Sequence, residues 1–399
     1  MRQRVIVAIG TVALASLTVP ASADGSAAGD PVQLEVAGPP IDAPRVPLRD
    51  FYRLPQATGE GFDGGRLAQR WAMLGREDRA AASASGGAEY SPRECAAAPN
   101  SAAGWDAVID AIAARAEGHR VVIINESHMV TRHRETTRRL LAKLQPLGFR
   151  VLAAETFNQG YGGPPPVEDT PAVSWPRMID GYYSGEPAFG RLVREARTLG
   201  YRLAAYEELF DPAAPVSDDP FAGIVRRETA QARHLAEIVQ RLQPDERLIV
   251  HAGYRHGAEV AFDYQGRDIE WMGARFKALT GIDPLTVTQT ACRSAGGTPF
   301  LAVPPEDQRP GQFDIVVSHP VDTFEDHRPR WRREAGDRAV AIPAPLRPTG
   351  EPLVIEAFAW GEPLEAVPVD RVLVEPGEDL PLLLPPGRYR VRAVRLAQP

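Results

Sequence analysis

Carboxylate and imidazole side chains follow the apolar segments of this chain in a repeated pattern. In residues 121–128, Val-Val-Ile-Ile-Asn-Glu-Ser-His, a run of β-branched apolar residues leads directly to Glu126 and His128. Carboxylates and imidazoles transfer protons in general acid–base catalysis and also bind divalent metal ions. Later apolar segments repeat the arrangement and end at Glu155, at Glu207 and Glu208, and at His251 and His256.

The spacing of Glu126 and His128 favours joint action. One residue separates them, so an extended backbone directs both side chains to the same side. Such a pair can share a metal ion, or act as a general base and its orienting partner. Glu155 follows four apolar residues at once, and a carboxylate buried there needs a partner. Of the adjacent acids after the next apolar segment, one is expected in a solvated loop, so Glu207 ranks below Glu155.

The segment 221–242 is typical of an amphipathic helix with polar residues in its apolar stripe. Glu228 and Gln231 lie in this stripe, and Arg227 borders it. A carboxylate on a buried helix face is costly unless it is paired or binds a ligand. Both a salt bridge with a core arginine and a role in a site are open for Glu228. The apolar residues of the stripe are Ile224, Leu235, Ile238, Val239 and Leu242.

Other polar residues near these segments receive simpler interpretations. His251 alternates with the apolar residues of its strand and is interpreted as a core histidine, whereas Gly253 allows a tight turn that would present His256. The helix after His128 begins with a run of charges that is interpreted mainly as a solvated face, although an arginine in its first turn could face an anionic substrate. This run contains Arg132, His133, Arg134, Arg138 and Arg139.

Alternating strand and helix patterns between residues 105 and 289 predict how these residues are positioned. The strands are expected at 121–125, 150–155, 201–207, 247–252 and 284–290, with one more at 313–317. The helices are expected at 105–117, 134–143, 189–198, 221–242 and 271–279. This alternation predicts an α/β fold with a mostly parallel sheet flanked by helices. Because ligands of such sheets bind beyond the carboxyl ends of the strands, the polar strand ends are expected to form one site.

The rest of the chain is predicted to add four further parts. Residues 1–23 have the pattern of a signal peptide cleaved after Ala23, and 24–100 that of an irregular leader with a short helix. The α/β core is expected at 101–320, a linker or exposed hairpin at 321–339, and a small C-terminal all-β module at 340–399. Within the core, the Gly- and Pro-rich segment 158–183 is long enough for a lid, a binding loop or a disordered segment.

The amino-acid composition and the predicted signal peptide exclude several classes of function. Cleavage of the signal peptide, 1–23, removes Arg2 and Arg4. The remaining chain has 43 basic residues against 52 acidic ones, and its formal charge changes from −7 to −9. Such an acidic surface argues against a nucleic-acid partner, and no later apolar run predicts a membrane span. A periplasmic or secreted protein is therefore expected. Its two cysteines, Cys95 and Cys292, either form a disulfide or remain buried thiols.

Several common catalytic motifs are absent from the sequence, among them Gly-x-Ser-x-Gly, His-Glu-x-x-His and Cys-x-x-Cys. Over residues 120–283 the chain instead resembles the superfamily of erythromycin-esterase-like and ChaN-like (haem-binding, iron-regulated) proteins, with the TraB/TIKI proteases as more distant relatives. In that superfamily one strand ends in Gly-Glu-x-His, a second in Glu, a helix carries an Arg-Asp or Arg-Glu pair, and a later strand ends in a histidine turn. The matching residues here are Glu126 and His128, Glu155, Arg227 and Glu228, and His256; Asn125 replaces the leading glycine.

This resemblance implies an exported hydrolase that acts on a small-molecule or peptide substrate. His128 or Glu155 would activate a water molecule, His256 would orient or protonate the leaving group, and Arg227 with Glu228 would position the others. A divalent metal, zinc or manganese, held by His128, Glu155 and His256 is an open addition to this scheme.

Two other interpretations remain. The resemblance also allows a ChaN-like haem- or iron-binding protein without hydrolytic activity, with Tyr254, Tyr182 or Tyr183 as the axial ligand. The last interpretation is an exported protein whose polar core is only structural.

Overall fold

The computed structural model describes residues 31–44, 51–56, 64–83, 90–101, 103–158, 166–169, 173–209 and 217–397. The predicted signal peptide, and residues 159–165 and 170–172 of the predicted lid or binding loop, lie outside this range. Across the described residues, none of the helices is both long and apolar enough to cross a membrane.

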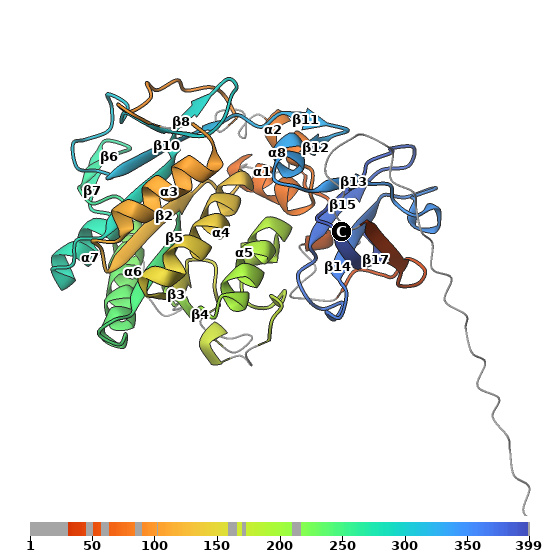
Figure 1. Ribbon diagram of the computed structural model, residues 1–399, viewed down its shortest axis with the longest axis horizontal. Coiled ribbons are helices and arrows are strands. Elements are labelled where there is room, and N and C mark those ends of the chain that lie inside the picture. The colour runs from red at the N-terminus through yellow and green to blue at the C-terminus, as the bar shows by residue number, and fades with distance from the viewer. Residues whose placement is uncertain are drawn as a thin grey trace, which may run out of the picture.

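A seven-stranded sheet forms the centre of an α/β fold (Figure 1). Neighbouring strands are parallel except at the edge, where β9 is antiparallel to β10. This sheet confirms the prediction of a mostly parallel sheet. In spatial order its strands are β4 (Arg202–Ala205), β3 (Phe149–Ala154), β5 (Arg247–Gly253), β2 (Val121–Glu126), β8 (Leu285–Ser294), β10 (Ile315–Pro320) and β9 (Phe300–Ala302).

Helices cover both faces of this sheet, which explains why the first four residues of its central strand, 121–124, are all apolar. Val122 and Ile124 of β2 pack toward α3 (Trp105–Ala116), α4 (Arg132–Leu144) and α5 (Pro187–Thr198). Val121 and Ile123 pack toward α6 (Ala222–Gln240) and α7 (Met272–Thr280) on the other face. A strand buried on both faces has no solvent side, so apolar residues do not alternate with polar ones.

The connections of the sheet reverse direction between β2 and β8. From β2 the chain passes through α4 to β3 on one side, whereas from β8 it continues to β10 on the other. Such a reversal separates the loops that follow the two strands and creates a crevice beyond their carboxyl ends. The carboxyl ends of β2 and β8 therefore border this crevice, and the ends of β5 and β3 lie next to that of β2.

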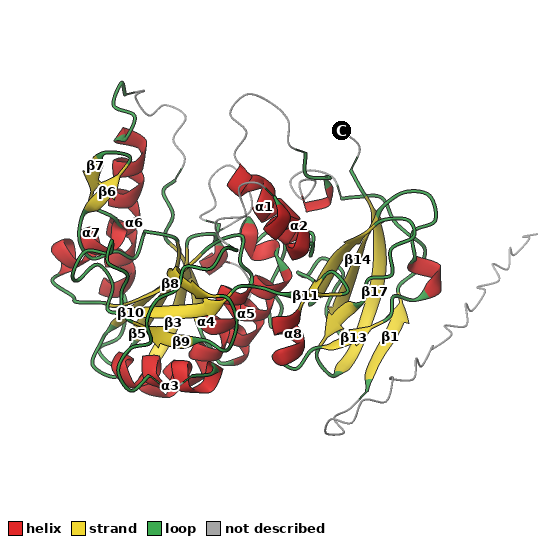
Figure 2. Ribbon diagram, turned by 90° about the horizontal axis from the view of Figure 1, so that it is seen from above, coloured by secondary structure: helices red, strands yellow, loops and turns green. Residues whose placement is uncertain are grey.

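A second sheet joins the two ends of the chain and lies apart from the first in Figure 2. Its strands, in order, are β1 (Val32–Val36), β17 (Gly387–Arg395), β14 (Leu353–Ala359) and β15 (Asp370–Val374). β1 runs parallel to β17, and the other pairs are antiparallel. The segment interpreted as an irregular leader thus supplies a strand, as well as α1 (Gly64–Met73) and α2 (Glu77–Ala82).

Smaller elements complete the structure. β13 (Arg338–Val340) pairs with β16 (Leu382–Leu384), and β6 (Phe262–Tyr264) pairs with β7 (Arg267–Ile269). The hairpin of β11 (Phe324–Glu325) and β12 (Arg328–Pro329) leads into α8 (Arg330–Glu334).

The charged segment that precedes β13 forms a hairpin, one of the two interpretations of its sequence, and the tip of this hairpin at 325–327 is exposed. Arg328 and Arg332 are buried, and both donate hydrogen bonds to the buried Asp370 at the start of β15. Apolar residues of the second sheet, such as Leu373, belong to the same core cluster as Phe189 of α5. The hairpin agrees with the prediction, whereas the burial of Arg328 and Arg332 does not, because opposite charges pair here inside the protein.

Cys95 and Cys292 form a disulfide, with their Cα atoms 5.8 Å apart. Of the two alternatives left open by the sequence, the structure contains the paired one. The bond ties the segment before α3 to β8, where Arg93 and Arg293 also pair through their backbones. It joins residues 197 positions apart in the sequence, so it closes most of the α/β core into one loop.

Replacing both cysteines by serine is expected to lower the free energy of unfolding by about 2–5 kcal/mol, because the unfolded chain regains the entropy of a long loop. Urea unfolding of the Cys95→Ser/Cys292→Ser variant, compared with the oxidised wild type, measures this loss. Wild type treated with reductant should approach the variant. Equal stability of all three samples would contradict a stabilising role for the bond.

Candidate active site

Glu126 is the centre of a hydrogen-bond network at the end of β2, and its side chain is fully buried. Its Oε1 lies 2.8 Å from Nδ1 of His128, and its Oε2 lies 2.9 Å from Nε2 of His251. Arg134 forms a bidentate ion pair with Glu126: its Nε donates to Oε2 at 2.8 Å and its Nη2 donates to Oε1 at 3.0 Å. Burial raises the pKa of Glu126, but Arg134 and His251 more than offset it and hold this pKa well below its usual value.

Arg134 corrects the interpretation of its helix as a solvated face. Its side chain is only 1% exposed. Besides Glu126 it contacts Glu186, at 2.6 Å, and the backbone oxygen of His128, at 3.0 Å. Glu186 in turn accepts hydrogen bonds from the first backbone amides of α5. Arg132 and His133 are buried too, so only Arg138 and Arg139, which pair with Glu135, fit the original interpretation.

Glu155 lies between two histidines at the end of β3. Its Oε1 is 3.8 Å from Nε2 of His128 and 3.8 Å from Nε2 of His256. Its Oε2 accepts a hydrogen bond from the amide of Gly253, at 2.6 Å. Burial raises the pKa of Glu155, but His256, His128 and Arg227 outweigh it and lower this pKa to about 2. Glu155 is therefore ionised at neutral pH.

His256 is presented by the turn after β5, as the sequence predicted. Its Nδ1 lies 2.7 Å from Oε1 of Glu228 on α6, whose Oε2 accepts from the amide of Met272 at 2.8 Å. Glu228 is thus paired with a site histidine instead of a core arginine. Burial lowers the pKa of His256, but the carboxylates of Glu155 and Glu228 more than offset it, so this pKa is raised.

The turn that presents His256 contains a glycine that cannot carry a side chain, Gly253, and a residue with strained backbone, Tyr254. A Cβ atom at Gly253 would lie 2.5 Å from Cε1 of His128 and 2.9 Å from Oε2 of Glu155. Tyr254 then has a positive φ of 39°, which non-glycine residues rarely adopt. Its amide donates to the backbone oxygen of Glu126 at 2.7 Å, which fixes the turn against β2.

Glu207 belongs to the cluster, although its position in the sequence ranked it low. Arg227 donates to Glu207 and also to Glu155, at 2.6 Å from Oε1, and its Nη1 lies 3.1 Å from Nε2 of His256. Gln231, one turn along α6 from Arg227, donates to Glu207 at 3.1 Å. One feature of the sequence could have indicated this role of Glu207: Gln231, a polar residue in the apolar stripe of the helix, needs a buried partner. Glu208 pairs with the exposed Arg226, and its side chain is 20% exposed against 25% for Glu207, so neither acid is fully solvated.

A guanidinium group lies among the residues predicted to bind a metal ion. Arg227 contacts both Glu155 and His256, so its positive charge already neutralises the carboxylate that a metal ion would need. In the part of the chain that the structure describes, no three His, Cys, Asp or Glu side chains are grouped as a metal site. The arrangement of His128, Glu155 and His256 therefore fits acid–base chemistry better than metal binding.

The tyrosines proposed as haem ligands have different environments. The ring of Tyr183 lies 4.4 Å from that of His128, and its buried hydroxyl has no hydrogen-bond partner among the described residues. Tyr254 approaches His128 edge-on at 5.0 Å, and Tyr182 is exposed. Burial, with Glu155 and Glu126 nearby, raises the pKa of Tyr183 well above its usual value, so its hydroxyl stays protonated. The role of these residues as haem ligands remains a prediction.

The residues of the cluster differ in their exposure to solvent. The side chains of His128 and Arg227 are 17% and 35% exposed, whereas those of Glu126 and Glu228 are fully or almost fully buried. The carboxylates that contact the Nδ1 atoms are therefore more deeply buried than His128 and Arg227, and His256, at 9%, is intermediate.

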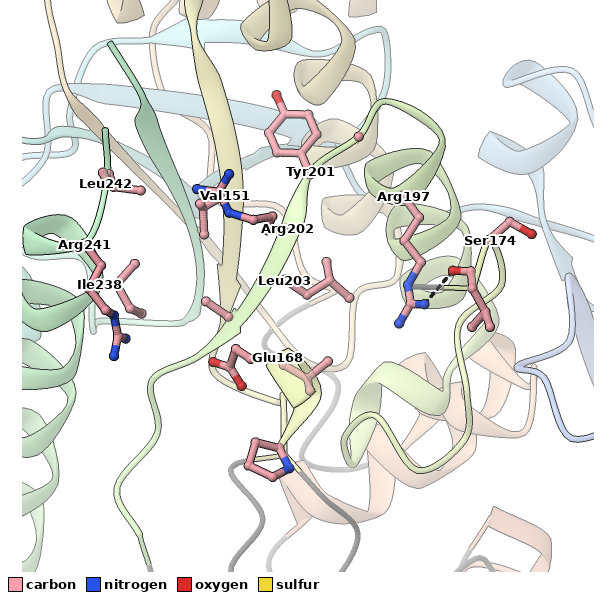
Figure 3. Close-up of a pocket in the computed structure, with 15 residues that line it drawn as sticks. Val151, Glu168, Ser174, Arg197, Tyr201, Arg202, Leu203, Ile238, Arg241 and Leu242 are labelled. Atoms are coloured by element: carbon pink, nitrogen blue, oxygen red, sulfur yellow. Dashed lines mark hydrogen bonds between the residues drawn. The ribbon is translucent and has the colours of Figure 1, made fainter. Parts of the chain in front are cut away.

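A separate cavity of about 920 Å³ lies beside the edge strand β4 (Figure 3). Val151, Leu203 and Ile238 contribute apolar lining, and Arg197, Arg202 and Arg241 contribute charge. None of the strand-end acids or histidines lines it. This cavity is therefore not part of the cluster around Glu155.

Comparisons with known proteins give weak similarities. No protein-family model matches the chain, and no curated protein matches it significantly. The type III effector HopBA1 shares 13% identity at a TM-score of 0.38, over 57% of this chain and 98% of that chain. RRSP, a MARTX toxin effector domain from Vibrio vulnificus CMCP6, shares 17% identity at 0.33, over 45% of this chain and 35% of that one.

Another similar structure is that of the C-terminal region of Pasteurella multocida toxin, described as having a thiol-protease like catalytic triad. It shares 11% identity at a TM-score of 0.33, over 55% of this chain and 28% of that one. Similarities at these TM-scores do not indicate a shared function.

Replacing Arg134 by methionine is expected to lower the free energy of unfolding by about 3–5 kcal/mol, because Glu126 and Glu186 would remain buried without their counter-charge. The matched control is Arg226→Met, which removes a half-exposed pair with Glu208 and should cost about 1 kcal/mol or less. Urea unfolding of both variants tests this difference. Equal losses would contradict the central role of Arg134.

The low pKa of Glu155 predicts a pH dependence of stability. Its pKa is about 2 in the folded protein against 4.5 as the ordinary value, so its contribution is complete above pH 4.5 and is lost as the pH falls toward 2. The difference in unfolding free energy between wild type and Glu155→Gln should therefore shrink by about 3 kcal/mol from pH 5 to pH 2. Urea titrations across this range measure it, and a constant difference would contradict the low pKa.

Proposed function

We propose that this protein is an exported hydrolase of the erythromycin-esterase-like type, in which histidines at strand ends activate water. The observation that carries the proposal is the paired arrangement of His128 and His256. Each has its Nδ1 beside a different buried carboxylate, Glu126 or Glu228. Each also has its Nε2 at 3.8 Å from the same oxygen of Glu155. Two imidazoles held in this way can divide the tasks of base and acid.

His128 is the general base in this proposal. Its Nδ1 donates to Glu126, which leaves the lone pair of Nε2 to accept a proton from a water molecule. Glu126 stabilises the imidazolium that forms and is not itself protonated, because its pKa is held well below the usual value. Glu155 is a poor proton acceptor at neutral pH for the same reason, with a pKa of about 2. These pKa values favour His128 over Glu155, the other candidate base.

His256 is the general acid. Its raised pKa favours the protonated form. Nη1 of Arg227, which can only donate, lies 3.1 Å from Nε2, so this nitrogen can give a proton to the leaving group once Arg227 turns toward the substrate oxygen. Arg227 holds Glu155 and Glu207 in position and brings positive charge close to the reacting carbonyl oxygen. Tyr183 keeps its hydroxyl proton beside His128 and is a second candidate donor to that oxygen.

The substrate class is an ester or amide of a small molecule or peptide. The cleavable leader in the sequence supports export, and the disulfide between Cys95 and Cys292 is compatible with an oxidising compartment. The contact of Arg227 with both Glu155 and His256 supports a reaction that needs no metal ion.

The test is a screen of esters, lactones and peptides against the purified mature protein, with and without chelator. At least one substrate should be hydrolysed at an unchanged rate in chelator. The His128→Asn and His256→Asn variants should each lower kcat by about 10²–10⁴-fold, as expected for the loss of a general base or acid. His119→Asn provides a matched control, because His119 precedes the opposite end of β2.

Thermal unfolding of each variant separates loss of chemistry from loss of folding. Two results would contradict the proposal: a wild type that hydrolyses nothing in the screen, or site variants that are folded and as active as His119→Asn. Activity that disappears in chelator and returns with zinc or manganese would instead support the metal-dependent scheme.

A further inference from the structure

Next to the catalytic cluster lies a second cavity, of about 380 Å³, at the reversal point between β2 and β8. Thr288 and Thr290 of β8 line one side of it, and Tyr254 separates it from His128. Its volume is within the range of ligand-binding pockets, and its place in the sheet is the one where open α/β folds usually bind ligands. None of the residues that line this cavity belongs to the acid–base cluster.

Three arginines line this cavity: Arg93, Arg255 and Arg293. The acidic residues that line it are Asp263 and Asp307, of which Asp307 pairs with Arg93 and Asp263 accepts from the amide of Gly266. The pair of Arg93 and Asp307 is exposed, and such pairs are weak. The positive charges therefore outnumber the negative ones, although the whole protein is acidic.

Arg255 is the arginine best placed to bind a ligand. Its guanidinium lies over the ring of Tyr264, 5.1 Å from the centroid, and forms no ion pair with any described residue. Tyr264 packs in turn against Trp271, so the guanidinium is held in place by a fixed aromatic surface. Stacking leaves the N–H groups at the edge of a guanidinium free to bind oxyanions.

A single turn positions both the cluster and the cavity. Tyr254, with its positive φ, directs the chain so that the buried His256 contacts Glu228 while the exposed Arg255 lines the cavity. The backbone oxygen of Tyr254 accepts a hydrogen bond from Asn125, which ties this turn to the end of β2. A ligand held by Arg255 would thus lie at a fixed position relative to the histidines.

We propose that this cavity binds an anionic group of the substrate, a carboxylate or a phosphate, and holds the scissile bond beside His128. The inference rests on the proposed function, since it names the substrate class of the same site. Arg255 and Arg293 would contact the anion, and Phe262, Phe313 and Tyr254 would contact the adjacent apolar part. The expected substrates are esters or amides that carry a negative charge near the bond that is cleaved.

Binding of simple anions tests this inference without any need for hydrolysis. Inorganic phosphate and glutarate are titrated separately into the mature protein by calorimetry, at constant ionic strength. At least one should bind at millimolar concentration, and Arg255→Gln should weaken it at least 10-fold, as expected for a lost charge-assisted hydrogen bond. Tighter binding of phosphate or of glutarate distinguishes the two kinds of substrate.

Arg330→Gln is the matched control, because Arg330 is an exposed arginine of α8 that does not line the cavity. Its affinity for the anion should equal that of the wild type. Absence of binding by both anions, or equal binding by wild type and Arg255→Gln, would overturn the inference.

A matched pair of neutral and carboxylate-bearing esters links the cavity to catalysis. If the protein is a hydrolase, the wild type should prefer the charged ester in kcat/KM, and Arg255→Gln should lose this preference mainly through a higher KM. Hydrolysis with no charge preference and no anion binding would leave the proposed function intact but contradict the anion site. Anion binding that is sensitive to Arg255→Gln, without hydrolysis of any ester, would contradict the proposed function alone.

Discussion

A carboxylate with no solvent exposure, Glu126, closes the central strand of the main sheet, and its charge must be balanced inside the protein. Arg134 supplies the counter-charge from α4, while His128 and His251 complete the hydrogen bonds to both carboxylate oxygens. Through Glu186, Arg134 also connects this network to the start of α5. One buried ion therefore fixes a strand end, two helices and the orientation of His128, the base in the proposed function.

On the opposite face of the sheet, α6 completes the site with a second pair of a buried carboxylate and a histidine. From α6, Glu228 holds His256 and Arg227 holds Glu155, so helices on both faces of the sheet contribute to one cluster. The close approach of Gly253 to His128 and Glu155 lets the ends of β2, β3 and β5 meet without a clash. Helices and strand ends therefore hold the polar groups in place. Among the described non-glycine residues with positive φ, Tyr254 is the one that lies in the turn before His256. Such preorganisation suits proton transfer, because the donor and acceptor atoms are already oriented.

Much of the fold followed from the sequence because apolar periodicity is a local signal. The strands that end at Glu126, Glu155 and near Glu207, and the helix that carries Arg227 and Glu228, lie where the pattern predicted them. The roles of Arg134 and Glu207 were missed, because sequence does not show that the first turn of α4 faces inward or that Gln231 reaches Glu207. The pairing of β1 with β17 was also missed, since it joins residues from opposite ends of the chain. Pairings of this kind depend on tertiary packing, which a local pattern does not contain.

The central claim is that Glu126 selects the tautomer of His128 in which Nδ1 carries the proton and Nε2, which lies 3.8 Å from Glu155, has a free lone pair. Nitrogen-15 chemical shifts of the His128 ring, recorded on histidine-labelled protein at a pH where the ring is neutral, report this directly. The account predicts a protonated Nδ1 in the wild type and a shift toward the Nε2-protonated form in Glu126→Gln. A wild-type His128 protonated at Nε2 would contradict it.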